Sequence, residues 1–229
     1  MAQLLTTHAS RLPQDCKLLC ADFSQGMLDQ AEARKSAHYE NAAEVVTWQR
    51  VQTRVLDTCN MGGIHDGSLS HIMANMVYFL TPAPRAALVE SRRCLREGGA
   101  LAVSSWEGSQ WLEVMRSIEG ARPDLGLPEL PAEWMTVEGA KGQLEGVGFE
   151  GVGFEGVVAE RVRAEFAFED HEGLVRTLKM TPPMRVKLDQ MTGEEEREAT
   201  RLMVEAARGF CPQAPGRLVG WAIVAAGRK

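Results

Sequence analysis

Short apolar runs alternate with helically spaced apolar residues along the first half of this chain. Each run is bounded by polar or turn-forming residues, and runs of this length are typical of strands that are buried on both faces of a sheet. Four strands are therefore predicted, at Lys17–Ala21, Val45–Val55, Leu69–Val77 and Ala100–Ser105.

Two helices are predicted between these strands. The first follows Ser24, whose side chain can cap it. The second is predicted over Thr81–Arg96. Thr81 would cap this helix, Pro82 suits its first turn, and Gly98-Gly99 would end it. The alternation of strands and helices predicts the α/β fold class, in which a parallel sheet carries helices on both faces.

The second half of the chain predicts helices followed by an antiparallel pair of strands. Helices are expected at Val137–Gly146, His171–Lys179 and Glu194–Phe210. Thr192 and Glu195 have capping-box spacing at the start of the last helix. A tandem repeat, GVGFE, occupies residues 146–150 and 151–155 and is interpreted as a turn that leads into a strand. The two strands are predicted at Val157–Phe168 and Arg217–Ala226.

Polar and aromatic residues stand at the ends of the predicted parallel strands. They are Asp22, Asp57, Asn75 and Ser105-Trp106. In open α/β sheets, ligands bind outside the carboxyl ends of the strands. A ligand cleft is therefore predicted along this edge of the sheet.

Composition and charge exclude several classes of protein. The chain has 229 residues, 45% of them hydrophobic, and its net charge of −6 with no run of basic residues argues against nucleic-acid and anionic-membrane partners. No signal peptide is recognisable, and no stretch approaches the roughly 18 apolar residues of a membrane span. The five cysteines are scattered and form no CxxC pair, which predicts free thiols in a reducing cytoplasm and no metal site.

Three segments carry a resemblance to a known family. They are LLCADFSQGML, VLDTCNMGGIHDGSLSHI and ANMVYFLTPAPRAALVESRRCLREGGALAVSSW. They resemble the class I methyltransferases of small-molecule metabolism, which use S-adenosylmethionine (SAM). The resemblance implies a Rossmann-like methyltransferase sheet with an antiparallel final strand. It also implies one domain over residues 1–229, in which residues 107–148 and 169–216 form helical insertions on the side of the methyl acceptor.

The resemblance also implies roles for individual residues. The cofactor-binding set comprises Asp22, Phe23, Met27, Asp57, Thr58, Asn75 and Met76. Asp22 would accept hydrogen bonds from the ribose hydroxyls, which are strong when the acceptor is charged. The substrate pocket would be lined by Tyr78, Phe79, Trp106 and Trp111. Ordinary loop, capping and core-packing roles remain open for all of these residues.

Catalysis has three candidate residues, His65, His71 and Tyr78. A neutral histidine beside the acceptor could act as a general base. Surface or structural roles are the alternatives for both histidines. Methyl transfer itself depends mostly on the alignment of the acceptor with the sulfonium methyl group, so little acid–base chemistry is required.

The family's first strand and its glycine-rich turn have no counterpart before Ala2, so an N-terminal truncation is expected. In the family that strand lies between the second and the fourth, and its loss would leave two inner sheet edges unpaired. A homodimer or a partner chain could complete the sheet. Three functions follow as alternatives: a SAM-dependent methyltransferase acting on a secondary metabolite, a cofactor-independent cyclase or isomerase that has lost SAM, and a non-catalytic partner subunit.

Overall fold

The computed structural model divides the chain into two compact units, Met1–His65 and Asp66–Lys229. It describes all residues except 1–7, 9–10, 14, 39–47 and 147–152. Part of the tandem repeat therefore lies outside the described residues. The prediction of a single domain over residues 1–229 stays a prediction.

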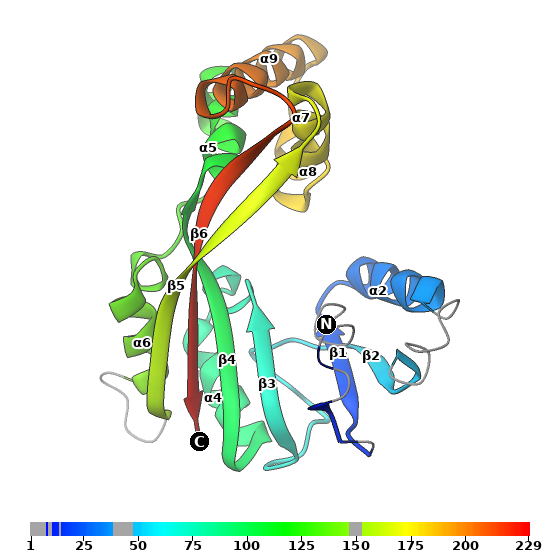
Figure 1. The fold of residues 1–229 in the computed structure, drawn as a ribbon, viewed down its shortest axis with the longest axis vertical. Coiled ribbons are helices and arrows are strands. Elements are labelled where there is room, and N and C mark those ends of the chain that lie inside the picture. The colour runs from blue at the N-terminus through cyan, green and yellow to red at the C-terminus, as the bar shows by residue number, and fades with distance from the viewer. Residues whose placement is uncertain (1–7, 9–10, 14, 39–47, 147–152) are drawn as a thin grey trace. The chain divides into compact units, whose positions relative to one another are not determined.

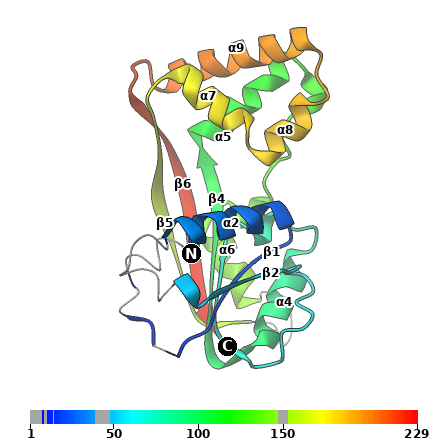
Figure 2. The ribbon, with the colours of Figure 1, turned by 90° about the vertical axis from the view of Figure 1, so that its right-hand side faces the viewer.

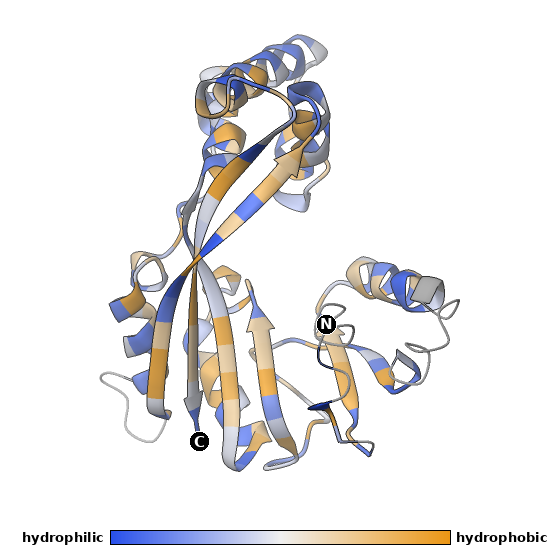
Figure 3. Cartoon of the chain, in the orientation of Figure 1, coloured by the Kyte–Doolittle hydropathy of each residue, from blue (hydrophilic) through white to orange (hydrophobic). Residues whose placement is uncertain are grey.

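The described residues of unit 1 include a parallel pair of strands and the helix α2. β1 (Leu18–Asp22) pairs with β2 (Val51–Val55) (Figure 1). The helix α2 (Gln25–His38) lies between the two strands in the sequence. The hydropathy colouring of Figure 3 shows β1 as hydrophobic along most of its length, as its sequence predicts. The carbonyl group of Ser24 accepts hydrogen bonds from the N–H groups of Met27 and Leu28, so α2 begins where the sequence predicts.

The second strand is shorter than predicted, because its first described residues are helical. Trp48 lies in a helical turn and is only 4% exposed. It forms a small core with Val51, and Leu18 and Cys20 pack against this core. The helical turn at residues 48–50 carries Trp48 into that core, so the strand begins at Val51; residues 45–47 of the predicted strand lie outside the described residues.

Unit 2 is built on a four-stranded sheet in the order β3-β4-β6-β5. β3 (Leu69–Asn75) and β4 (Leu95–Ser109) are parallel. β6 (Gly216–Arg228) is antiparallel to β4 and to β5 (Glu155–Phe168), which confirms the predicted antiparallel pair. The parallel pairs and the antiparallel end together give the predicted α/β fold class, and the parallel strands fall into two separate sheets.

The helix α4 (Pro84–Cys94) is shorter than predicted at both ends. Thr81 is extended and follows a 3-10 turn at Tyr78–Leu80, so it does not cap α4. The N-cap is Ala83, with φ −140° and ψ 70°. The helical conformation is disfavoured before a proline, so Pro84 rather than Pro82 occupies the first turn.

The predicted stop at Gly98-Gly99 is also wrong. α4 ends at Cys94, Leu95 is extended, and β4 runs through both glycines. Gly98 N–H donates to the Lys229 carbonyl, and Lys229 N–H donates to the Gly99 carbonyl. The glycines are therefore held in the sheet by the last residue of the chain.

Two helices cover one face of this sheet. α4 contacts β4, and α6 (Val137–Glu145) contacts β5 and β6. Figures 1 and 2 show α4 and α6 on the same side of the four strands. Gly146 caps α6 in the left-handed conformation with φ 67°, as a glycine at this position allows.

The other helices of unit 2 gather at the far ends of β4, β5 and β6 (Figure 1). We call these four helices the helical arm: α5 (Gln110–Arg116), α7 (His171–Lys179), α8 (Pro182–Leu188) and α9 (Gly193–Phe210). α7 and α9 confirm the predicted helices, whereas α8 was not predicted. Short 3-10 turns at Ser117–Gly120, Pro123–Leu125 and Ala132–Trp134 link α5 to α6.

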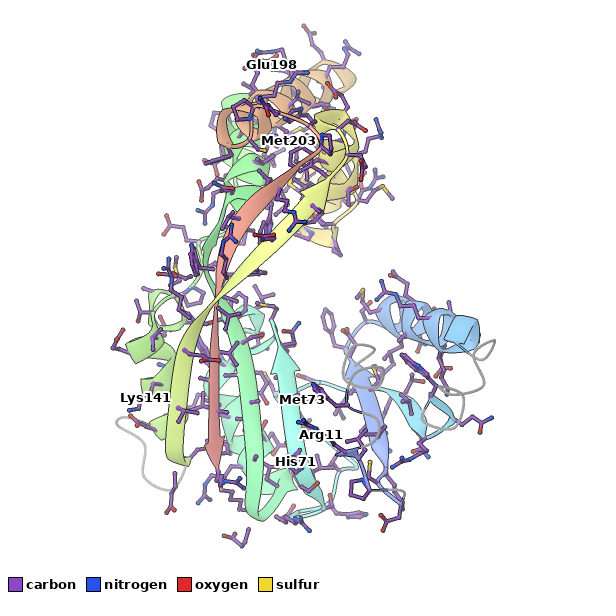
Figure 4. All side chains as sticks on the ribbon, in the orientation of Figure 1. Arg11, His71, Met73, Lys141, Glu198 and Met203 are labelled. Carbon is purple, nitrogen blue, oxygen red and sulfur yellow. The ribbon has the colours of Figure 1, made fainter. Side chains whose placement is uncertain are left out.

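The helical arm has an apolar core of its own. Met184 and Met203 are completely buried in it, together with Leu178 and Leu218. Met203 and the exposed-face residue Glu198 are both labelled on α9 in Figure 4. Met180, by contrast, is 71% exposed. Most of the methionines in this segment are therefore core residues.

β1 and β3 are edge strands of their sheets. Among the described residues, β1 pairs with β2, and β3 pairs with β4. The expected loss of a strand between them stays a prediction.

The start of α9 gives a first testable prediction. Thr192 Oγ1 accepts the N–H of Glu195, and Glu195 Oε2 accepts the N–H of Thr192 at 2.7 Å, which completes a capping box. Thr192→Ala should lower the free energy of unfolding by about 1 kcal/mol, measured by urea denaturation. Glu194→Ala, which removes an exposed neighbouring carboxylate, should cost less, and an equal cost would contradict the capping role.

The capping box also predicts a pH dependence. The pKa of Glu195 lies below its ordinary value, chiefly because the Thr192 N–H donates to its carboxylate. A depressed pKa in the folded state adds stability above the unfolded pKa, and this stability is lost as the pH falls through the folded value. The difference in the free energy of unfolding between the wild type and Glu195→Ala, measured by urea denaturation at several pH values, should therefore shrink in acid.

Candidate functional site

The two carboxylates at the ends of β1 and β2 lie at the same end of their sheet. Asp22 is the last residue of β1, and its carbonyl accepts the N–H of Leu56 at 3.0 Å, which brings Asp57 alongside. Asp22 Oδ1 accepts the N–H of Ser24 (2.9 Å), and Asp57 Oδ1 accepts the N–H of Cys59 (2.8 Å). Each carboxylate thus organises its own turn with one oxygen.

Apolar side chains stand beside Asp22 on the surface of unit 1. Phe23 is 81% exposed and Met27 is 46% exposed. Both side chains offer apolar surface that a ligand could cover. A pocket of about 220 Å³ lies between α2 and the two strands, and Asp22 and Met27 line it. Thr58, in the turn after Asp57, is half-buried.

β3 ends in an unusual backbone conformation. Met76 has φ 56°, in the left-handed region, which costs a side-chain-bearing residue about 1–2 kcal/mol. Ser104 of β4 stabilises this turn, since its Oγ accepts the Met76 N–H at 3.1 Å. The same hydroxyl donates to Oδ1 of Asn75 at 2.8 Å. Asn75 and Met76 are thereby held together at the carboxyl end of β3.

Tyr78 and Phe79 lie inside unit 2, with 2% and 4% of their surface exposed. The Tyr78 hydroxyl is hydrogen-bonded to Ser91 Oγ. Ser91 already donates to the Ala87 carbonyl, so Tyr78 is the donor in this bond. Both aromatic residues pack in the core, and their predicted roles in catalysis and acceptor binding stay predictions.

The histidines are spread over several environments. His71 lies four residues before Asn75 on β3, about 13 Å along an extended strand, and Figure 4 shows it towards the opposite end of β3. Its Nδ1 is 3.0 Å from Ser70 Oγ. His65 is exposed at the end of unit 1. Buried His171 lies 2.7 Å from the Cys211 carbonyl and has a structural role.

An aromatic cluster lies where β4 leads into the helical arm. Trp106 and Trp111 meet edge to face with centroids 5.0 Å apart, and Phe166 is 6.1 Å from Trp111. The strand register places Val162, which is 38% exposed, on the same sheet face as Trp106. The sequence analysis missed Phe166, although alternation of Phe166 and Phe168 along β5 could have indicated it.

Other kinds of site find no support in the described part of the chain. No group of histidine, cysteine or carboxylate side chains there could hold a metal ion. The five cysteines, all among the described residues, form no disulfide, and burial raises the pKa of the Cys94 thiol. No helix in the same ranges is long and apolar enough to cross a bilayer.

Comparison with known proteins adds to this geometry. Residues 3–103 match the family model of the methyltransferase domain. The methyltransferase ucsB of Acremonium sp is 36% identical over 228 residues, which cover 99% of this chain and 77% of that protein. The methyltransferase ktnA of Aspergillus niger is 25% identical over 93% of this chain and 75% of its own length. The methyltransferase tpcH of Aspergillus fumigatus is 27% identical over 52% of this chain and 39% of its own.

Solved structures agree on the fold. A candidate methyltransferase from Bacillus halodurans C-125 has a TM-score of 0.53 and 17% identity, covering 93% of this chain and 83% of the other. A candidate type II methyltransferase from Anaeromyxobacter dehalogenans has a TM-score of 0.51 and 15% identity, with 93% and 80% covered. Together with the near full-length similarity to ucsB, the fold shows that the chain belongs to the class I methyltransferase family.

Proposed function

We propose that this chain is a SAM-dependent methyltransferase that acts on a small-molecule acceptor. The observation that carries the proposal is the surface around Asp22. A carboxylate at a strand end lies there near two exposed apolar side chains, Phe23 and Met27. This combination suits the ribose hydroxyls and the adenine ring of an adenosyl group.

The residues of unit 1 fit the adenosyl part of SAM. The carboxylate of Asp22 has an oxygen available beyond the one that Ser24 uses, and adjacent ribose hydroxyls can donate to it. Phe23 and Met27 offer exposed apolar surface to the adenine ring, and a flexible methionine adapts to such a ring. Asp57 and Thr58, held beside β1, extend the same end of the sheet.

SAM supplies an electrophilic methyl group when it is bound. The protein's share of the reaction is then to bind both reactants and to align the acceptor atom with that methyl group. Trp106, Trp111 and Phe166 form a partly exposed aromatic surface in unit 2, which suits a flat or apolar acceptor. A role of His65 or His71 as the general base that removes a proton from the acceptor stays a prediction.

Isothermal titration of the chain with SAM tests the proposal. Saturable binding with one site per chain is the expected result, and S-adenosylhomocysteine should compete. ATP serves as a control ligand, because it shares the adenosine part but adds a highly charged triphosphate. If millimolar SAM gives no heat and no change in thermal stability, the proposed function is wrong for this chain. Turnover of a metabolite without SAM would favour a cyclase or isomerase instead.

A further inference from the structure

The side chain of Gln110 continues the hydrogen-bonding pattern of the sheet beyond the end of β4. The pairing of β4 with β6 ends at Ser109, which lies opposite Gly220. The next N–H group along β6, that of Val219, donates to Oε1 of Gln110 at 2.7 Å. This bond fixes the orientation of the amide group, because only its oxygen can accept a backbone N–H.

The amide nitrogen of Gln110 is left for another partner. Nε2 carries two N–H groups, and it donates to no residue in the part of the chain that the structure describes. Gln110 is half-buried. A site that holds such a donor in place selects ligands with a hydrogen-bond-accepting atom and rejects analogues that lack it.

The aromatic cluster lies next to this amide group. Trp111 follows Gln110 in α5, and its ring packs against Gly220, the neighbour of Val219 in β6. A Cβ atom at Gly220 would overlap the ring, so the close approach requires a glycine there. The planes of Trp106 and Trp111 meet at 81°. A flat aromatic molecule can therefore contact this corner with its face and with its edge, the two arrangements that aromatic rings prefer.

We propose that Gln110 is a specificity-determining residue for the methyl acceptor and selects a flat aromatic molecule that carries a carbonyl oxygen. The aromatic cluster contacts the rings of this molecule, and Nε2 of Gln110 donates a hydrogen bond to its oxygen. The role of the molecule as methyl acceptor rests on the proposed function. Its recognition does not, because every residue that takes part belongs to unit 2.

Gln110→Glu separates the two hydrogen bonds of this side chain. A carboxylate at this position keeps an oxygen that can accept the Val219 N–H, but it has no N–H group to donate. Gln143→Glu is the matched control, because it makes the same change of charge at another half-buried glutamine, on α6 outside the helical arm. Unchanged hydrogen exchange of the Val219 amide, measured by NMR, would show that Gln110→Glu keeps its bond to β6.

The experiment compares two probes, 1-indanone and indane. Both are flat bicyclic aromatic molecules, and a carbonyl group in the first replaces a methylene group in the second. NMR titrations without SAM follow the indole N–H signals of Trp106 and Trp111 and the side-chain amide signals of Gln110. In the wild type, both probes should shift the indole signals, and the amide signals should shift more with 1-indanone than with indane.

The ratio of the affinities for the two probes measures the contribution of the hydrogen bond. The affinity for 1-indanone relative to indane should fall about 5-fold in Gln110→Glu, since one hydrogen bond of ordinary strength is lost. Gln143→Glu should keep the wild-type ratio. A merely structural role of Gln110 would weaken the binding of both probes equally, and an unchanged ratio would overturn the inference. Wild-type Gln110 amide signals that respond equally to the two probes would overturn it without any variant.

The two proposals fail in different ways. A wild-type chain that binds SAM but does not distinguish the probes through Gln110 would overturn this inference alone. A chain that distinguishes the probes as expected but binds no SAM would overturn the proposed function and leave the recognition of an aromatic ketone in place.

Discussion

Replacing Asp22 with asparagine is expected to weaken SAM binding by roughly 100-fold. Each hydrogen bond to a charged group contributes about 1.5–3 kcal/mol, and 2.7 kcal/mol corresponds to about 100-fold in affinity. Asparagine keeps an oxygen that can accept the Ser24 N–H, so the turn after β1 should stay in place. Calorimetric titration of both proteins with SAM measures the change directly.

The control for this substitution is Asp29→Asn. Asp29 lies on the exposed side of α2, where its Oδ1 accepts a hydrogen bond from Gln25 at 2.8 Å. The two substitutions change the net charge equally, but only one alters the strand end. An equal loss of affinity in both variants would mean that overall charge, rather than a contact with Asp22, controls binding. Equal melting temperatures of wild type and Asp22→Asn would confirm that the variant folds normally.

Replacing Gly220 with alanine should lower the free energy of unfolding of unit 2 by about 3 kcal/mol. A Cβ atom at this position would lie 2.3 Å from Trp111 Cη2 and 2.6 Å from Ser109 Cβ. Atoms cannot approach so closely, so the Trp111 ring or the backbone of β4 must move. The change corresponds to a fall in melting temperature of roughly 6–12 °C for a unit of this size, measured by circular dichroism.

Gly108→Ala is the matched control, since Gly108 belongs to the neighbouring strand β4. A Cβ atom there would meet no atom within 4 Å, so stability should change little. The displaced ring should also alter the tryptophan fluorescence of Gly220→Ala, because Trp111 packs against Trp106 and Phe166. A Gly220→Ala protein with wild-type stability and fluorescence would contradict this packing.

Sequence patterns over a few residues predicted correctly those helices and strands whose ends are determined by neighbouring residues. The helix at His171–Lys179 was predicted with the bounds that the structure has, and the Thr192–Glu195 capping box is present. These features need only side chains and backbone groups a few positions apart. The end of β1 was predicted for the same reason, because a polar residue follows a short apolar run.

Long-range pairing explains the largest errors. Gly98-Gly99 is a reasonable helix stop in isolation, yet the backbone of Lys229 bonds to both glycines and draws them into β4. The residues around these glycines do not indicate a hydrogen-bonding partner about 130 positions later in the chain. The start of α4 is different, since the constraint that Pro84 places on Ala83 was available in the sequence and outweighs the cap at Thr81.

The candidate site was only partly predictable for a related reason. Asp22 and Asp57 were found because strand ends are visible in the sequence. The burial of Tyr78 depends on its contact with Ser91, thirteen positions away on another element. The contact of Phe166 with the aromatic cluster depends on the pairing of β5 with β6. The bonds of Ser104 to β3 likewise require the register of two strands, which the apolar pattern alone does not specify.

The place of β6 in its sheet has a consequence for synthesis on the ribosome. β6 follows every other strand in the sequence, yet it lies between β4 and β5 and pairs with both. Until residues 216–228 leave the exit tunnel, β5 has no paired strand in this sheet and β4 is paired only with β3, so a strand edge of each stays open to wrong pairing. The nascent chain can therefore complete the sheet of unit 2 only after residues 216–228 have emerged, and its open strand edges most need a chaperone before then.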